Sequence, residues 1–137
     1  MCLLDTNIVS EAGRGTKPAV DWLRSMRPDT LHLSVITLGE IARGIASKER
    51  TDPRAGAHLS AWLGALRRDH AARILPVTDT IALEWGRIGS LRPRGDADGL
   101  VAATALVQGL VLVTRNVAAF ADLGVPLVDP WADAGDP

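Results

Sequence analysis

The sequence predicts a three-layer α/β/α sandwich around a short, mainly parallel sheet of roughly five strands. Short apolar runs recur along the whole chain, and helical repeats of apolar residues separate most of them. Strands that alternate with helices favour parallel pairing through right-handed crossovers, which cover both faces of the sheet. A binding site in such a sheet lies beyond the carboxyl ends of the strands, where the strand order reverses.

The expected strands are short apolar runs, at residues 2–4, 32–34, 74–77, 110–113 and 127–128. The run at 110–113 has the clearest strand pattern. Pro76 favours an edge position for the third run, because proline cannot donate a hydrogen bond to a neighbouring strand.

Helices are predicted where apolar residues recur at helical spacing, at residues 17–26, 38–45, 59–66, 81–88 and 96–108. The polar stretch 47–57 is interpreted as a link between two of them. Thr78 or Asp79 is expected to cap the fourth helix, and Asp96 the fifth. Gly109 stands in the usual glycine position after a helix end.

The composition indicates a single domain. With 137 residues, of which 47% are hydrophobic, the chain is long enough to bury a core. We expect this domain to span residues 1–131, followed by a flexible tail at 132–137. The formal charge of −1 is unlike the strongly basic balance of a typical nucleic-acid binder, so a polyanionic partner would have to meet local arginines.

Cysteine content and hydropathy suggest a cytoplasmic protein. Cys2 is the single cysteine, which excludes an intramolecular disulfide and a cysteine-rich zinc site. The chain does not open with a secretory signal pattern. The longest apolar region, residues 100–113, is interrupted by polar residues and is shorter than the ~20 residues that a membrane-spanning helix needs.

Asp5, Glu40 and Asp98 stand in mostly apolar or small-residue segments, where an unpaired carboxylate is costly to bury. Asp5 follows the first strand, and its plain structural role would be a turn or a helix cap. Glu40 would complete a capping box with Thr37, unless Ser34 begins the helix and places Glu40 well inside it. Three such acids suggest a metal site.

Two further segments allow both a structural and a functional interpretation. Asp96 and Asp98 both fit the first turn of a helix, where the helix dipole favours anions. Apolar residues continue the face of Asp98, so Asp96 is interpreted as the cap and Asp98 as the site residue. Arg115 and Asn116 could be a surface charge and a turn residue, but they directly follow the clearest strand, where a site is expected.

Several other site classes are disfavoured. The histidines show no ligand spacing, and the chain has no Gly-Xaa-Ser-Xaa-Gly motif and no phosphate-binding glycine loop. Trp22, Trp62 and Trp85 fit a core or a subunit contact more simply than a base-stacking surface.

Four motifs, in this order and spacing, resemble the PIN-domain ribonucleases, and most closely the VapC-type toxins of bacterial toxin–antitoxin pairs. The motifs are Leu-Leu-Asp-Thr-Asn at 3–7, Ser-Val-Ile-Thr-Leu-Gly-Glu at 34–40, Asp-Gly-Leu-Val-Ala-Ala-Thr-Ala at 98–105 and Val-Thr-Arg-Asn at 113–116. The closing Val-Pro-Leu-Val-Asp-Pro-Trp at 125–131 is also similar to family members. The resemblance covers almost the entire chain.

The resemblance implies an α/β/α sandwich in which carboxylates at the strand ends hold Mg²⁺ or Mn²⁺. By motif, the ligands would be Asp5 and Asp98, with Glu40 completing the cluster. Asn116 stands where some members have a fourth acid, which weakens the case for a second tightly held ion and leaves Asn116 as a neutral contact to water or phosphate. Contacts to the substrate or to the acids are expected from Thr6, Asn7, Thr114 and Arg115, and Arg43 is a further candidate for a phosphate contact.

The implied activity is that of an endoribonuclease. A bound ion lowers the pKa of a water, orients it towards the scissile phosphorus and neutralises the developing charge. Mg²⁺ suits this role because it prefers oxygen ligands and keeps positions open for water and substrate. The resemblance also implies a structured RNA substrate such as a transfer or ribosomal RNA, a toxin homodimer, and a VapB-type antitoxin whose C-terminal segment covers the acidic pocket. The helices of Trp22 and Trp62 are candidate contacts for these partners.

Three other protein classes share parts of this pattern. A haloacid-dehalogenase-like phosphatase needs a second acid two residues after the first, where this chain has Asn7. A receiver domain needs an adjacent acidic pair at the first strand and a lysine near the last, whereas the lysines here are Lys17 and Lys48. A catalytically degenerate PIN-like scaffold stays open, although the presence of all three acids argues against it.

Overall fold

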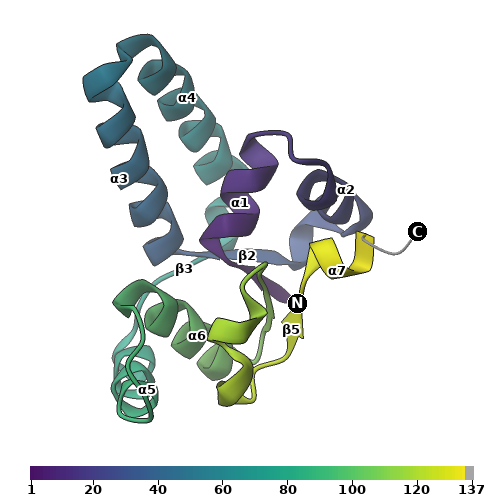
Figure 1. The fold of residues 1–137 in the computed structure, drawn as a ribbon, viewed down its shortest axis with the longest axis vertical. Helices are drawn as coiled ribbons and strands as arrows, with labels where there is room; N and C mark the ends of the chain where they lie inside the picture. The colour runs from purple at the N-terminus through teal and green to yellow at the C-terminus, as the bar shows by residue number, and fades with distance from the viewer. Residues whose placement is uncertain (135–137) are drawn as a thin grey trace.

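The computed structural model describes residues 1–134 and contains a five-stranded, all-parallel sheet between two layers of helices (Figure 1). The strands are β1 (Cys2–Leu4), β2 (Leu31–Ser34), β3 (Ile74–Leu75), β4 (Val111–Val113) and β5 (Leu127–Val128). Their order is β3-β2-β1-β4-β5, so the strand order reverses between β1 and β4. The predicted α/β/α fold is confirmed, and β3 lies at an edge as Pro76 indicated.

The helices are α1 (Thr6–Gly13), α2 (Lys17–Ser25), α3 (Val35–Thr51), α4 (Pro53–Asp69), α5 (Asp79–Gly89), α6 (Asp96–Gln108) and α7 (Pro130–Ala134). Short 3₁₀ turns occur at η1 (Pro28–Thr30), η2 (Ala71–Arg73), η3 (Val117–Ala119) and η4 (Ala121–Leu123). Within residues 1–134, no helix combines the length and the apolar character needed to cross a membrane.

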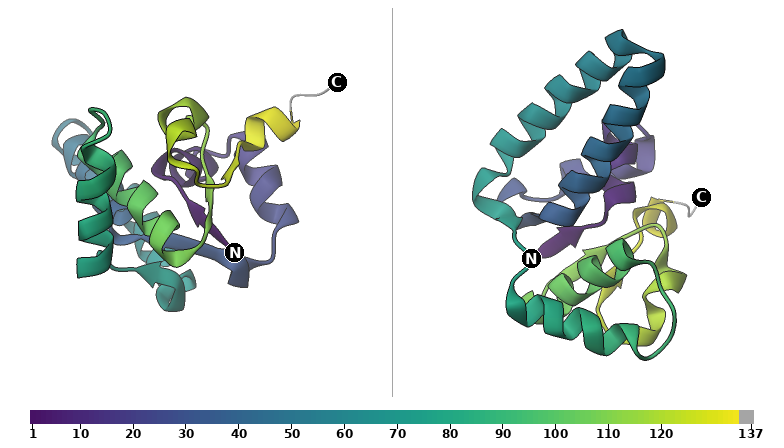
Figure 2. Two further views of the ribbon diagram at one scale, coloured as in Figure 1. Left: turned by 90° about the horizontal axis from the view of Figure 1, so that it is seen from below. Right: turned by 90° about the vertical axis from the view of Figure 1, so that its left-hand side faces the viewer.

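The two faces of the sheet build two cores. Leu3 points into the core that is completed by α5 and α6, whereas Cys2 and Leu4 point into the core formed with α1 and α3. This alternation is the normal consequence of strand geometry. Figure 2 shows the resulting layers, with the α3–α4 pair on the opposite side of the sheet from the α5–α6 pair.

Three expected helix ends are present. Ser34 caps α3 through a hydrogen bond from the Ile36 N–H to its hydroxyl, and Thr78 caps α5 through the Ile81 N–H. Gly109 follows α6 with a φ of 67°, a left-handed conformation that glycine adopts without steric cost.

Two predictions about helices were wrong. The stretch 47–57 is not a link, because α3 continues to Thr51 and α4 begins at Pro53. Its charged residues are good helix formers, and Asp52 caps α4 through the Ala55 N–H, with the proline in the first turn. The two helices form a long hairpin that projects from the sheet (Figure 1).

Asp96 is not the cap of α6. Gly95 occupies the N-cap position without a side-chain hydrogen bond, and Asp96 is the first helical residue. Helix α1 was not predicted at all. At the other end of the chain, α7 extends to Ala134, and residues 135–137 lie outside the described residues, so the flexible tail stays a prediction.

Candidate active site

Asp5 stands at the carboxyl end of the central strand and is buried, with 5% of its surface exposed. Its Oδ1 accepts a hydrogen bond from the Thr6 N–H at 2.8 Å, which makes it the N-cap of α1. Its Oδ2 accepts bonds from the Thr114 hydroxyl at 2.8 Å and from Asn7 Nδ2 at 3.2 Å. The expected helix cap is therefore present, and the second carboxylate oxygen faces two of the predicted site residues.

The end of β4 is bonded to the start of α1 through Asn7. The Asn7 amide group donates to the Thr114 hydroxyl at 3.3 Å, and its Oδ1 accepts from the Arg115 N–H at 3.2 Å. The Asn116 N–H also donates to the Thr114 hydroxyl, at 3.0 Å, while the Asn116 residue is exposed. The two strand ends on either side of the order reversal are thus held together by polar side chains.

Glu40 reaches this region from α3. The Thr6 hydroxyl donates to Glu40 Oε1 at 2.5 Å and lies 3.2 Å from the hydroxyl of the buried Thr37. Because Ser34 caps α3, Glu40 lies well inside the helix and is not part of a capping box. Thr37 was not among the predicted site residues, although its position three residues before Glu40 on a helix could have indicated it.

Asp98 lies in the first turn of α6 and is half-buried. The helix continues below it with the buried Val101, Ala102 and Ala105, as its apolar face predicted. Among the described residues, no hydrogen-bond donor and no ion-pair partner lowers the pKa of the Asp98 carboxylate. A carboxylate in that position is free to accept an external ligand.

The three carboxylates lie in one negative field. Burial raises the pKa of Asp5, and the charges of Asp98 and Glu40 raise it further, against the lowering effect of its hydrogen bonds. Burial also raises the pKa of Asp98, with a further contribution from the Glu40 charge. Within residues 1–134, the ion pairs of lysine and arginine involve other acids.

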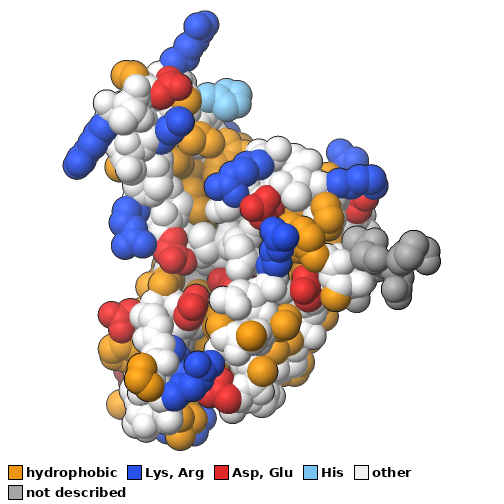
Figure 3. Space-filling view, viewed as in Figure 1, with side chains coloured by type: hydrophobic (Ala, Val, Ile, Leu, Met, Phe, Trp, Pro, Cys, Tyr) orange, Lys and Arg blue, Asp and Glu red, His pale blue; other side chains and the backbone are white. Residues whose placement is uncertain are grey.

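The donor set fits a hard divalent cation. Among the described residues, no three His, Cys, Asp or Glu side chains are close enough to form a ready-made metal site. The oxygen donors of Asp5, Glu40 and Asp98 are nevertheless the type that Mg²⁺ and Mn²⁺ prefer, and their mutual repulsion is what a cation would relieve. Figure 3 shows acidic side chains gathered in a hollow between the α3–α4 hairpin and the α5–α6 pair.

Arg115 and Arg43 differ in their surroundings. The guanidinium carbon of Arg115 lies 4.6 Å from the ring centroid of Trp131, in a cation–π contact. Trp131 was not predicted to belong to the site, since no local pattern links it to Arg115. Arg43 is exposed on α3.

Comparison with known proteins decides the family. The PIN domain matches residues 2–125. The chain belongs to the PIN-domain family. It is 28% identical to the VapC ribonuclease Y4jK of Sinorhizobium fredii, over 98% of this chain and 100% of that protein. It is 32% identical to the toxin FitB of Neisseria gonorrhoeae, over 97% of this chain and 100% of FitB.

Solved structures agree with the sequence relatives. The crystal structure of FitAcB from Neisseria gonorrhoeae superposes with a TM-score of 0.88 at 32% identity, covering 96% of this chain and 99% of that chain. A toxin–antitoxin complex from Klebsiella pneumoniae superposes with a TM-score of 0.69 at 27% identity, over 95% and 98% of the two chains. The resemblance to VapC-type toxins is confirmed.

Proposed function

We propose that this PIN-domain protein is a divalent-metal-dependent endoribonuclease and the toxin of a toxin–antitoxin pair. The observation that carries the proposal is the shared negative field of Asp5, Glu40 and Asp98, which come from three distant segments. The field lies where the strand order reverses, the usual place for a site in a parallel sheet. The names of the relatives, a VapC ribonuclease and a toxin, support the same activity.

Asp5, Asp98 and Glu40 are the residues that would hold the ion. When bound, Mg²⁺ or Mn²⁺ supplies a water of lowered pKa and neutralises charge on the phosphate oxygens. Asn7 and Thr114 fix the orientation of Asp5, and the Thr6 hydroxyl fixes Glu40.

Arg115 and Asn116 are assigned to the substrate. Stacking on Trp131 holds the Arg115 guanidinium by its face and leaves its N–H edge for a phosphate of the RNA. Asn116 is exposed and supplies a neutral contact to water or phosphate. Arg43, on the exposed side of α3, is a second phosphate contact. These few cations suit an RNA recognised by its shape, such as a transfer or ribosomal RNA, more than one bound by charge alone.

An antitoxin segment is assigned to a groove of about 410 Å³ that begins at Thr6 and Glu40. The groove continues along the α3–α4 hairpin, where Ile41, Leu59 and Trp62 give it apolar walls. A peptide lying in it would shield the acids from RNA. Trp22, the other predicted contact, is half-buried and packs against the core on the α1 side of the sheet.

The test is RNA cleavage by the purified chain, freed of any partner, with total RNA and Mg²⁺ or Mn²⁺. We expect cleavage that a chelator abolishes and added metal restores. Asp5→Asn should be inactive, whereas Asp69→Asn, a change at an exposed acid at the end of α4, should cleave normally. Equal cleavage by the wild type and Asp5→Asn would reject the site, and no cleavage by either would favour the degenerate scaffold.

A further inference from the structure

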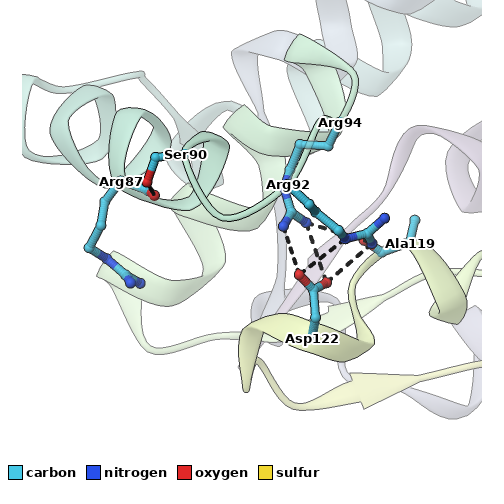
Figure 4. A network of polar contacts seen from close by, with 6 residues as sticks. All are labelled: Arg87, Ser90, Arg92, Arg94, Ala119 and Asp122. Atoms are coloured by element: carbon cyan, nitrogen blue, oxygen red, sulfur yellow. Dashed lines mark hydrogen bonds and ion pairs between the residues drawn. The ribbon is translucent and has the colours of Figure 1, made fainter.

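A second polar network connects the loop before α6 to the segment after β4 (Figure 4). Arg94 Nη2 donates to Asp122 Oδ2 at 2.7 Å, and Arg92 Nε donates to the same oxygen at 3.1 Å. Arg92 Nη2 also donates to the Ala119 carbonyl at 2.9 Å. Two arginines from one loop therefore hold a single turn of the other segment, and we refer to Arg92, Arg94 and Asp122 as the clamp.

The two arginines of the clamp differ in burial. The Arg94 side chain is only 7% exposed, while those of Arg92 and Asp122 are 45% and 37% exposed. Arg94 Nε is buried and has no hydrogen-bond partner among the described residues. Burying a guanidinium with an incomplete set of partners is unfavourable. Arg94 is held in place chiefly by Asp122, and its bonds to that carboxylate, together with those of Arg92, lower the pKa of Asp122 well below its usual value.

The position of Arg94 shows what the clamp holds. It directly precedes Gly95, the N-cap of α6, which has no side-chain hydrogen bond to secure the helix start. Asp98 lies in the first turn of that helix, and the next residue is Gly99. A Cβ on Gly99 would lie 2.9 Å from Trp85 Cδ1 and 3.8 Å from Arg94 Cδ. Arg94 and Trp85 therefore pack against the turn that presents Asp98.

We propose that Arg94 and Asp122 are positioning residues, which fix Asp98 for binding the metal ion. The inference rests on the proposed function. A helix start without a capping side chain leaves its first N–H groups without side-chain partners, and movement of this turn would carry the Asp98 carboxylate away from Asp5 and Glu40. The clamp prevents this by joining the start of α6 to the segment that follows Thr114 and Asn116.

Mn²⁺ binding by the RNA-free protein tests the clamp directly. Arg94→Gln and Asp122→Asn remove its charges, and loss of a residue that orients a metal ligand weakens metal affinity by about 10- to 100-fold. We expect at least about a 10-fold loss by calorimetric titration, together with a lower kcat and a smaller change in KM for RNA. Arg94→Lys, which keeps a charged bond to Asp122, should recover part of the affinity.

Arg87→Gln is the matched control. Arg87 pairs with Glu84 on the exposed face of α5, and Figure 4 shows its side chain pointing away from the clamp. We expect this variant to bind Mn²⁺ like the wild type. Asp122→Asn keeps the shape of the side chain, so it tests the same bonds if Arg94→Gln does not fold, as judged by circular dichroism.

The outcomes separate the clamp from the metal site itself. If Asp98→Asn loses Mn²⁺ while folded Arg94→Gln and Asp122→Asn bind it normally, the clamp has no positioning role. If the wild type and Asp98→Asn titrate alike, the proposed metal function fails, and the inference fails with it. Equal losses in Arg94→Gln and Arg87→Gln would show a general effect of surface charge and overturn the inference.

Discussion

At the scale of the residue, Asp5 combines a structural and a chemical role. One oxygen caps α1, while burial and the charges of Asp98 and Glu40 raise its pKa above the usual 3.8. Between 3.8 and the raised pKa, the folded protein therefore binds more protons than the unfolded chain. Stability consequently falls as pH rises through this window, and above it the ionised carboxylate destabilises the fold in full.

Asp5→Asn should be more stable than the wild type at neutral pH, because removal of a buried charge that lies beside Asp98 and Glu40 outweighs the exchange of one acceptor oxygen for an N–H₂ group. The gain should shrink as pH falls through the raised pKa of Asp5, where the wild type becomes neutral too. Mn²⁺ should stabilise the wild type more than Asp5→Asn, since the variant keeps only Asp98 and Glu40 as charged ligands. Thermal unfolding from about pH 4 to about pH 8, with and without Mn²⁺, measures all three effects. A wild type that Mn²⁺ does not stabilise would contradict the assignment.

At the scale of the element, α3 and α5 provide a comparison of two capped helices. Ser34 and Thr78 each accept a hydrogen bond from the first turn of their helix. Only α3 carries predicted site residues, since Thr37 and Glu40 both meet Thr6. Loss of either cap should lower stability, but only loss of the α3 cap should disturb the acidic cluster.

Ser34→Ala and Thr78→Ala should each lower the free energy of unfolding by about 1 kcal/mol, the usual effect of losing a hydroxyl cap. Urea unfolding measures this loss. Cleavage of RNA should fall in Ser34→Ala and stay near the wild-type rate in Thr78→Ala, because fraying of the first turn of α3 would displace Thr37, which contacts the Thr6 hydroxyl beside Glu40. Equal rates in the two variants would mean that the start of α3 does not control the site.

The same elements show how far sequence reasoning extends. Strands such as β4 were predicted because a short, unbroken run of apolar residues is typical of a strand buried on both faces of a parallel sheet. Helix α1 was missed because its only buried residues are Ile8 and Val9, too few to give a helical repeat. The stretch 47–57 was misread because polarity was taken as a sign of a loop, although Asp52 and Pro53 form a regular helix start.

For the site, family motifs indicated the acids but not what holds them. Thr114 and Asp5 are 109 positions apart, and Arg94 and Asp122 are 28 apart, so no local pattern could join either pair. Polar contacts of this kind depend on the packing of the sheet and its helices.

At the scale of the whole molecule, charge distribution matters more than net charge. The formal charge is −1, yet several acids gather in the hollow beside the α3–α4 hairpin, and basic side chains lie along that hairpin on the same face (Figure 3). A cation in the hollow would reduce the local repulsion of RNA, and the hairpin would attract its phosphates. Under the proposed function, an antitoxin segment in the adjoining groove would compete with RNA for this face.

Expression of the chain alone should therefore arrest the growth of a bacterial host, because no antitoxin blocks the site. Asp98→Ala should relieve the arrest and remain folded, since within the described residues its carboxylate has no bonded partner to leave unsatisfied. Asp96→Ala changes the exposed acid two residues earlier in the same turn and should arrest growth like the wild type. Colony counts after induction, with circular dichroism of each purified variant, provide the measurement. Continued arrest by a folded Asp98→Ala variant would place the toxicity outside the acidic cluster. Asp96→Ala is the matched control, because it removes an acid from the same turn of α6 but leaves Asp98, the acid in the field of Asp5 and Glu40, in place.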